Sequence, residues 1–426
     1  MTRHSLSFFL CGLALAALRL TAAEPPTDWI DPDTGHRIIR LSREPDTASL
    51  YFHQNAFSPQ GDAMILTSPS GISVIALATR EIKLIAPGVQ YSVTTSSGVE
   101  FGRRSRRVFY EKDGAIFATD IDTLATRQLA RLPRGGAMSA INADETLAVG
   151  ILNEGPVPPG PVGWPAPGTV MLGPDGRPLS FAEQREVLLN RRVDQRLPMA
   201  MFTLNLQTGE VRTILHTTDW LGHVQFSPTD PGLLMFCHEG PWHRVDRIWT
   251  MRTDGSGQTK VHTRTMNMEI AGHESFGADG RMIWYDLQTP RGVDFWLAGY
   301  EIATGRSLRY HLDRNEWSVH FNSSPDGRLF IGDGGDSEMV AHAPDGKWIY
   351  LFHPEDVPDV AGLKAPDSAS LIRTGYFRAE RLVNMAKHNY QLEPNVHFTP
   401  DMKWVVFRSN MHGPVHVYAV EVARAR

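Results

Sequence analysis

A short turn-and-strand pattern recurs along most of this 426-residue chain, and it constrains the fold more than any other feature. Each copy places an aromatic or small residue before a turn rich in Pro, Asp, Asn or Gly, and a short β-rich run follows. The copies are FSPQGDAMIL (57–66), INADETLAVGI (141–151), FSPTDPGLLMF (226–236), FGADGRMIWY (276–285), SSPDGRLFIG (323–332) and FTPDMKWVVF (398–407). A second strand, a polar turn and another strand follow most copies, and counting both signatures gives seven units. Their spacing of roughly 40–55 residues is the period of blade-type β repeats.

These repeats predict an all-β protein, a seven-bladed β-propeller formed by residues 24–426 as a single domain. Such a ring closes without long exposed sheet edges, and the stretch HRIIRLS (37–43) is expected to supply the partner strand of the last blade. The best candidate for a helix is the amphipathic segment SFAEQREVLLNRRVDQRL (180–197). It belongs to an expected insertion at about residues 154–198, which begins with the Pro/Gly-rich run EGPVPPGPVGWPAPG.

Residues 1–23 have the features of a secretory signal peptide. Arg3 and His4 precede the apolar run LSFFLCGLALAAL, and the small residues of LTAAE suit cleavage after Ala23. The apolar run is too short for a comfortable membrane span, and no later segment approaches ~18 continuous apolar residues. The sequence therefore predicts a soluble, exported protein that is periplasmic or secreted and has no membrane-bound part after signal cleavage.

Charge and cysteine content narrow the expected partners and chemistry. The formal net charge is −5 and falls by two, to −7, when Arg3 and Arg19 leave with the signal peptide. This balance argues against a nucleic-acid or anionic-membrane surface. Because Cys11 lies in the signal peptide, Cys237 is left alone and no intrachain disulfide is possible. Cys237 ends an apolar run, so we interpret it as a small buried thiol, with a thiol nucleophile as the alternative.

Polar side chains lie a few residues before the turn in five of the units, on the strand expected nearest the propeller axis. Because the loops of the blades converge there, residues far apart in the sequence can meet at one mouth. The residues are His53, Gln54, Asn55, His223, His273, Glu274, His320, Asn322, Glu393, Asn395 and His397, with His388 slightly upstream. Any one histidine alone can be a hydrogen-bonded structural residue. Together, imidazoles with carboxylates and amides suit a divalent cation such as Mn²⁺ or Zn²⁺.

Several motifs, taken in order along the chain, resemble those of oligogalacturonate lyases, secondary enzymes of pectin breakdown. The motifs are DWLGHVQFSP, FCHEGPWHRVDRIW, GHESFGADG, SVHFNSSPDGRLFIGDGG, PNVHFTPD and SNMHGP. The resemblance runs through most of residues 30–422 and is strongest at 219–335 and 394–414. It implies a seven-bladed propeller that cleaves short uronate oligosaccharides by β-elimination, with a divalent metal, Mn²⁺ foremost, as cofactor.

The resemblance also implies roles for individual residues. His273 matches the proton-abstracting base of the family, and Arg247 matches an arginine that would clamp the substrate carboxylate. His320 matches a metal-binding histidine, whereas Glu393 and Asn395 replace the two imidazoles of the family's His-Pro-His run. Oxygen atoms of Glu and Asn can still bind a hard cation. The other expected site residues are His388 as a further metal ligand, and His53, Gln54, His238 and Glu239 at the sugar subsites.

Two other functions remain open from the sequence. Because Glu393 and Asn395 replace two histidines of the family, the chain is also compatible with a lyase that acts on a different uronate polysaccharide, such as ulvan, alginate or rhamnogalacturonan fragments. The turns alone suit a non-catalytic periplasmic propeller, an interaction module of the Tol-associated type, although such a scaffold has no need for His273, His320 and Arg247 to converge. For Arg247 itself, the alternative is a structural ion pair with Asp246 or another acid.

Overall fold

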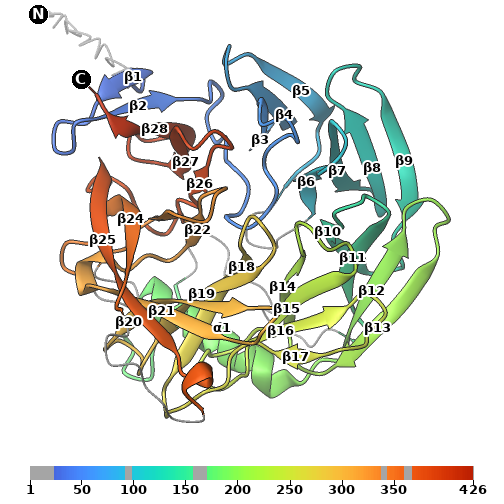
Figure 1. Ribbon diagram of the computed structural model, residues 1–426. Helices are drawn as coiled ribbons and strands as arrows, with labels where there is room; N and C mark the ends of the chain where they lie inside the picture. The colour runs from blue at the N-terminus through green and yellow to red at the C-terminus, as the bar shows by residue number, and fades with distance from the viewer. Residues whose placement is uncertain (1–23, 92–97, 157–169, 337–342, 359–366, 426) are drawn as a thin grey trace, which may run out of the picture.

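Along the described part of the chain, seven groups of short antiparallel strands surround a central axis, so the fold is a seven-bladed β-propeller (Figure 1). The computed structural model describes residues 24–91, 98–156, 170–336, 343–358 and 367–425. The expected signal peptide, residues 1–23, lies outside these ranges. Within them, no helix is both long and apolar enough to cross a membrane.

The first three blades follow the chain from residue 63 to residue 217. Blade one contains β3 (Ala63–Ser68), β4 (Gly71–Ala76) and β5 (Ile82–Pro87). Blade two contains β6 (Val99–Phe101), β7 (Arg107–Lys112), β8 (Ala115–Asp120) and β9 (Thr126–Arg131). Blade three contains β10 (Gly136–Ile141), β11 (Leu147–Asn153), β12 (Met199–Asn205) and β13 (Val211–Thr217).

Blades four to six have four strands each. Blade four contains β14 (Leu221–Phe226), β15 (Leu233–His238), β16 (Ile248–Arg252) and β17 (Thr259–Lys260). Blade five contains β18 (Ile270–Phe276), β19 (Met282–Gln288), β20 (Phe295–Glu301) and β21 (Ser307–Leu312). Blade six contains β22 (Phe321–Ser323), β23 (Phe330–Gly332), β24 (Trp348–Asp356) and β25 (Arg373–Asn384).

The last blade is closed by the N-terminal end of the described chain. Its strands are β26 (His397–Phe398), β27 (Trp404–Ser409), β28 (His416–Arg424), β2 (His36–Arg40) and β1 (Asp28–Ile30). β2 pairs with β28, where Ile38 lies opposite Val420 and Ile39 opposite Ala419. The prediction that the stretch at 37–43 completes this blade is confirmed. The pairing ties the two ends of the ring together.

The outer strands of blades five and six pair with each other, which the repeat pattern does not predict. β21 runs parallel to β25, with Leu308 opposite Arg373 and His311 opposite Tyr376. The two blades therefore form one eight-stranded sheet. This pairing covers two strand edges that would otherwise be exposed.

Three of the recurring turns are held by a hydroxyl side chain at the start of the turn. Ser58, Ser324 and Thr399 each accept a hydrogen bond from the backbone N–H five residues later, at 3.1, 2.9 and 3.1 Å. A hydroxyl that satisfies this N–H fixes the hairpin between the first and second strands of a blade. The sequence repeat is thus a repeat of turn chemistry.

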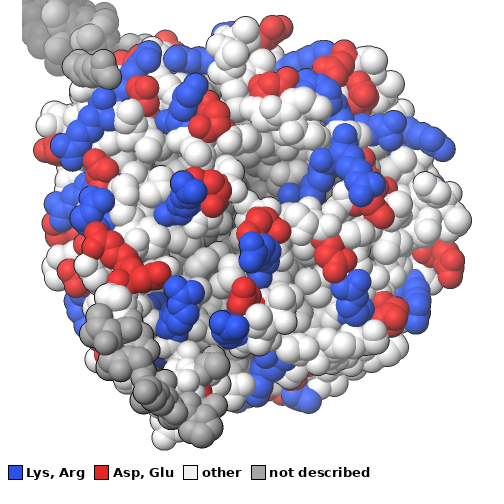
Figure 2. All heavy atoms as spheres, in the orientation of Figure 1, with Lys and Arg blue, Asp and Glu red and all other residues white. Residues whose placement is uncertain are grey.

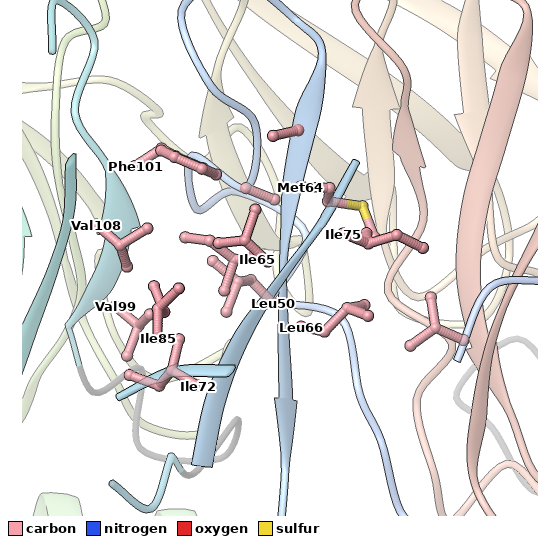
Figure 3. Packing of buried hydrophobic residues seen from close by; sticks show 14 of the residues in the cluster. Leu50, Met64, Ile65, Leu66, Ile72, Ile75, Ile85, Val99, Phe101 and Val108 are labelled. Carbon is pink, nitrogen blue, oxygen red and sulfur yellow. The ribbon is translucent and has the colours of Figure 1, made fainter. Parts of the chain in front are cut away.

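Apolar side chains fill the spaces between neighbouring blades. Ile65 and Ile72 of blade one pack with Val99 and Val108 of blade two (Figure 3). All four side chains are buried. Because side chains pack densely on both faces of a blade, the position of its innermost strand is fixed.

One helix interrupts the third blade. α1 (Phe181–Gln195) lies between β11 and β12 in the chain, within the expected insertion. Ser180 Oγ accepts the backbone N–H of Glu183 at 3.3 Å, and the Glu183 carboxylate accepts the N–H of Ser180 at 2.8 Å, which forms a capping box. The helix predicted at 180–197 is confirmed. Two short 3₁₀ turns are η2 (Arg314–Glu316) and η3 (Ser368–Ser370).

Candidate active site

Backbone bulges redirect two histidines on the innermost strands of blades four and five. β14 and β18 each contain a Gly-His pair at a corresponding place. The pairing register shifts after Gly222 in β14 and after Gly272 in β18, and His223 and His273 have φ values of 48° and 44°. A bulge re-aims the side chain that it carries, and left-handed φ values of non-glycine residues concentrate at functional sites.

Five ring side chains meet near the axis, two from the segment before blade one and one each from blades four, five and six. The ring centroids of His273 and His320 are 4.9 Å apart, and His223 lies 6.5 Å from His273 and 5.5 Å from His53. Tyr51 packs edge-on against His53, His223 and His320, at 5.0, 5.5 and 5.1 Å. The predicted convergence of histidines from separate blades is therefore confirmed for His53, His273 and His320.

Two of these imidazoles are oriented by buried carboxylates. His273 Nδ1 lies 2.9 Å from Asp286 Oδ1, and His320 Nδ1 lies 2.8 Å from Asp333 Oδ2. When Nδ1–H points at a carboxylate, the lone pair of the neutral imidazole is on Nε2. A carboxylate hydrogen-bonded to Nδ1–H also orients many metal-binding and proton-accepting histidines in other proteins. His273 Nε2 is thus left for a ligand, whereas His320 Nε2 lies 3.2 Å from the Tyr51 hydroxyl, a contact that a ligand would replace.

Burial controls the ionisation of His273 and Asp286. Burial, together with the charges of His320 and Arg247, holds the pKa of His273 well below its ordinary value of 6.5. Burial also raises the pKa of Asp286 to about 7. The His273 imidazole is therefore neutral at pH 7 and able to accept a proton.

Arg247 lies beside the histidines, not on the surface. Its Nε donates to Glu274 Oε2 at 2.9 Å. Its guanidinium carbon lies 5.4 Å from the ring centroid of Trp242, whose ring packs edge-on against His273 at 4.9 Å. Asp246 pairs with a lysine of β17, whereas Arg247 forms a buried ion pair with Glu274, so the structural ion pair that the sequence left open is present with another acid. Arg247 Nη1 is buried and has no hydrogen-bond partner among the described residues, so its N–H groups are available to an anion.

Glu393 brings a carboxylate to His320. Its Oε2 lies 3.8 Å from His320 Nε2, and its Oε1 lies 3.1 Å from Nη1 of Arg185 on α1. Burial opposes ionisation of this carboxyl, but His320 and Arg185 outweigh it and lower the pKa of Glu393 to about 2. The carboxylate is therefore ionised at neutral pH.

Asn395 and His388, two expected metal ligands, make hydrogen bonds within the protein. Asn395 Oδ1 accepts the backbone N–H of Phe52 at 3.0 Å, and its Nδ2 donates to the Glu393 carbonyl oxygen at 3.1 Å. Both ring nitrogens of His388 are in hydrogen bonds, Nδ1 to Ser409 Oγ at 2.9 Å and Nε2 to a backbone carbonyl at 2.7 Å. The side chains of Asn395 and His388 hold the loop that presents Glu393.

Two of the expected subsite residues lie on the far side of the histidine cluster. Glu239 lines the same pocket as His273. His53 and Gln54 instead line an axial channel formed by turn residues of all the blades. Gln54 Oε1 also accepts the backbone N–H of Tyr51 at 3.2 Å, which is a structural contact. Glu239 and the pair His53 and Gln54 therefore line two different pockets.

Strand alternation in β15 separates Cys237 from His238. Cys237 points toward His223 and Glu274, and the three candidate ligand atoms lie within 4.8 Å of one another. His238 points to the opposite face from Cys237 and packs against Trp249, with ring centroids 6.0 Å apart. Burial raises the pKa of the Cys237 thiol well above its ordinary value, and the interpretation of Cys237 as a buried thiol is confirmed.

The pocket lies between α1 and the blades. Its lining includes Arg185, Glu186 and Leu189 from α1, and Glu239, Trp242, His273 and Arg291 from blades four and five and the loops that flank them. Figure 2 shows acidic and basic side chains interspersed over one face of the ring, which is hollowed near its centre. Basic groups and an indole beside a neutral imidazole suit an acidic sugar.

Some residues of the site were not identified from the sequence. Asp286 and Asp333 carried a usable signal, because each is a lone carboxylate beside an apolar strand run, in MIWYDLQ and FIGD. Arg185 carried none, since a helical pattern does not say where an inserted helix docks. Tyr51 could not be identified from the sequence either, because its contacts are with histidine rings that come from other blades.

Comparison with known proteins gives a consistent result. A family model described as oligogalacturonate lyase matches residues 195–425, more than half of the chain. The oligogalacturonate lyase of Dickeya dadantii is 25% identical over 417 residues, covering 92% of this chain and 95% of that protein. The oligogalacturonide lyase of Pectobacterium atrosepticum is 30% identical over 239 residues, covering 52% of this chain and 55% of that protein.

A solved structure is similar over nearly the whole fold. It is described as an oligogalacturonate lyase in complex with manganese. The TM-score is 0.71 at 22% sequence identity, and the match covers 93% of this chain and 96% of that one. At this identity the likeness supports the architecture described above.

Proposed function

This chain belongs to the oligogalacturonate lyase family, and from that premise we propose that it cleaves short galacturonate oligomers by β-elimination. The reaction removes the C5 proton of a uronate and expels the O4 glycosidic oxygen, which leaves a C4–C5 double bond. The observation that carries the proposal is the meeting of His273, His320 and Arg247 in one buried cluster, from which His273 reaches the pocket under α1. This chemistry needs a general base, a histidine that can bind a metal ion, and a guanidinium that can bind the carboxylate of the substrate.

His273 is assigned as the base. Its Nδ1 is held by Asp286, so Nε2 carries the lone pair, and its lowered pKa keeps the ring neutral at working pH. A positioned general base contributes about 10²–10⁴-fold to the rate. The C5 proton is too weakly acidic for an imidazole alone, so the base needs a partner that stabilises the enolate-like intermediate.

Arg247 is assigned to the carboxylate of the substrate. Glu274 holds its Nε at 2.9 Å, and Trp242 lies against the guanidinium, so the side chain is oriented before the substrate arrives. Its buried N–H groups can bind the carboxylate next to C5. Charge-assisted hydrogen bonds of this kind are about twice as strong as neutral ones.

The donor set of His320 and Glu393 fits a hard divalent cation, and Mn²⁺ is the proposed ion. The 3.8 Å between His320 Nε2 and Glu393 Oε2 allows both atoms to reach one cation at about 2.0–2.3 Å. Asp333 holds His320 in the tautomer that a metal requires. When bound, the ion neutralises charge that develops on the substrate carboxylate.

The grouping of His223, Cys237 and Glu274 is less suited to Mn²⁺. The Cys237 thiol is buried with a raised pKa, and a soft sulfur ligand does not favour a hard cation. The histidine–carboxylate pair on the other side of the cluster therefore remains the proposed site.

The location of the enzyme is a separate proposal, which rests on the signal-peptide features of residues 1–23. An exported lyase would meet acidic oligomers outside the cytoplasm. Expression of the full chain, followed by fractionation and N-terminal sequencing, tests this proposal. A mature N-terminus at Glu24 in the periplasm or medium supports it, and an uncleaved cytoplasmic protein contradicts it.

Incubation of the purified protein with di- and trigalacturonate and Mn²⁺ tests the reaction directly, with the absorbance of the unsaturated product as readout. Parallel incubations with alginate, ulvan and rhamnogalacturonan oligomers are needed because Glu393 and Asn395 stand where the family has imidazoles. Activity confined to one of those oligomers would reassign the substrate. A folded protein that forms no unsaturated product from any uronate would overturn the lyase proposal in favour of an interaction module.

A further inference from the structure

Helix α1 is held over the active-site pocket by charged side chains from three other blades. The ion pairs are Arg185–Glu393 at 3.1 Å, Arg192–Glu239 at 3.2 Å and Glu186–Arg291 at 3.0 Å. The helix belongs to an insertion in blade three, so these contacts are not needed to form its own blade. They fix the helix against the site, and with it the pocket-facing arginine Arg185.

Arg185 and His320 lie on opposite sides of one carboxylate. Arg185 Nη1 is 3.1 Å from Glu393 Oε1, while His320 Nε2 is 3.8 Å from Glu393 Oε2. Arg185 lines the pocket that contains His273, and its side chain is 24% exposed, whereas the His320 side chain is fully buried. The guanidinium therefore stands on the pocket side of Glu393.

The Glu393 carboxylate cannot neutralise both the Arg185 guanidinium and a divalent cation. A carboxylate carries a single negative charge, and Arg185 already pairs with Glu393 at 3.1 Å. A divalent cation held by His320 and Glu393 would lie within a few ångströms of the same guanidinium. Like charges at that distance repel strongly in a partly buried site.

We propose that Arg185 competes with the divalent cation for Glu393, and that once the cation is bound the released guanidinium binds a carboxylate of the substrate. The inference rests on the proposed function. The metal-free protein keeps Glu393 neutralised, and the metal-loaded protein offers a second guanidinium to an acidic sugar. Because a uronate oligomer carries one carboxylate on each residue, Arg247 and Arg185 can bind two neighbouring carboxylates.

This arrangement predicts opposite effects of one substitution. Removing the charge of Arg185 should strengthen metal binding, because the competitor for Glu393 is gone, and should weaken binding of the oligomer. A merely structural role of Arg185 in holding α1 would weaken both. The sign of the change in metal affinity therefore distinguishes the two roles.

Two binding measurements test the inference without turnover. Electron paramagnetic resonance of free Mn²⁺ gives the metal affinity of the substrate-free protein. Calorimetry gives digalacturonate binding to the Mn²⁺-loaded protein in a His273→Gln background, which prevents turnover. Arg185→Gln should bind Mn²⁺ about three- to tenfold more tightly and digalacturonate about tenfold or more weakly.

Two control variants narrow the result. Arg185→Lys keeps the competing charge, so its Mn²⁺ affinity should stay near that of the parent, while its binding of digalacturonate is weakened by loss of the planar fork. Arg196→Gln removes an exposed ion pair with Asp219 at the end of α1 and should leave both affinities unchanged. Circular dichroism confirms the fold of each variant.

Weaker Mn²⁺ binding by Arg185→Gln, or unchanged affinity for both ligands, overturns the inference. A parent protein that binds no Mn²⁺ overturns it as well. These results are independent of the turnover assay, so the lyase proposal can stand when the competition fails, and the competition can be measured when turnover is absent.

Discussion

Replacing Asp286 with asparagine should make the protein more stable at neutral pH while removing most of its activity. Asp286 is fully buried; its Oδ1 meets His273 Nδ1 at 2.9 Å, and its Oδ2 has no hydrogen-bond partner among the described residues. A carboxylate oxygen left unpaired in the interior is costly. Asparagine has the same shape and no charge, so it removes this cost.

The size of the gain follows from the pKa of Asp286, which burial raises from 3.8 to about 7. Because the folded protein holds this proton more tightly than the unfolded chain, its stability falls as the pH rises from about 4 to about 7. The rise in pKa corresponds to roughly 4 kcal/mol of unfolding free energy at pH 8. A weaker hydrogen bond to His273 offsets about 2 kcal/mol of this. The variant should therefore gain on the order of 2 kcal/mol at pH 8 and little at pH 4.

The same substitution should lower kcat by about 10²–10⁴-fold, because the imidazolium that forms on His273 loses its counter-charge. Urea denaturation at pH 5 and pH 8 measures the stability, and turnover of trigalacturonate measures the activity. The gain in stability should be larger at pH 8. A variant that is equally destabilised at both pH values, or one that keeps the parental kcat, would refute the reasoning.

Three further substitutions separate the remaining roles. Arg247→Lys keeps the charge but loses the planar fork that Glu274 and the substrate share, so kcat/KM for trigalacturonate should fall about 10²-fold; an unchanged kcat/KM would remove Arg247 from the site. Glu393→Gln should weaken Mn²⁺ binding about 10–100-fold, read by electron paramagnetic resonance, because His320 loses its anionic partner ligand; metal affinity equal to the parent's would discard Glu393 as a ligand. Cys237→Ala should change kcat by less than about twofold, and the native thiol should resist alkylation, because it is buried with a raised pKa; rapid inactivation by an alkylating agent would show instead that the thiol is exposed and reactive.

The blades could be predicted from the sequence because their turns use the same chemistry. Ser58, Ser324 and Thr399 stand at the same place in their turns and make the same hydrogen bond, so a local pattern marks these three blades. The parallel pairing of β21 with β25 could not be predicted in this way. It depends on how close the outer edges of two neighbouring blades come, and no local pattern encodes that distance.

The positions of the site histidines could also be predicted, but not the contacts of every side chain. His273 and His320 lie at the same place before their turns, so the ring brings them together. The direction of His238 depends on strand register, because a shift of one residue sends a side chain to the opposite face. Asn395 has the chemistry of a ligand, yet its amide oxygen is taken by the backbone N–H of Phe52. Such competition for one lone pair is decided by tertiary contacts, which the sequence does not display.

The most direct test of the account is the rate at which His273→Gln forms unsaturated product from trigalacturonate, measured beside the parent protein at equal Mn²⁺ content and with both proteins shown to be folded. The account predicts that kcat falls by at least about 10²-fold while the oligomer still binds, because the base is lost and the carboxylate contacts remain. A variant that turns over within about tenfold of the parent would contradict the assignment of the proton-abstracting base.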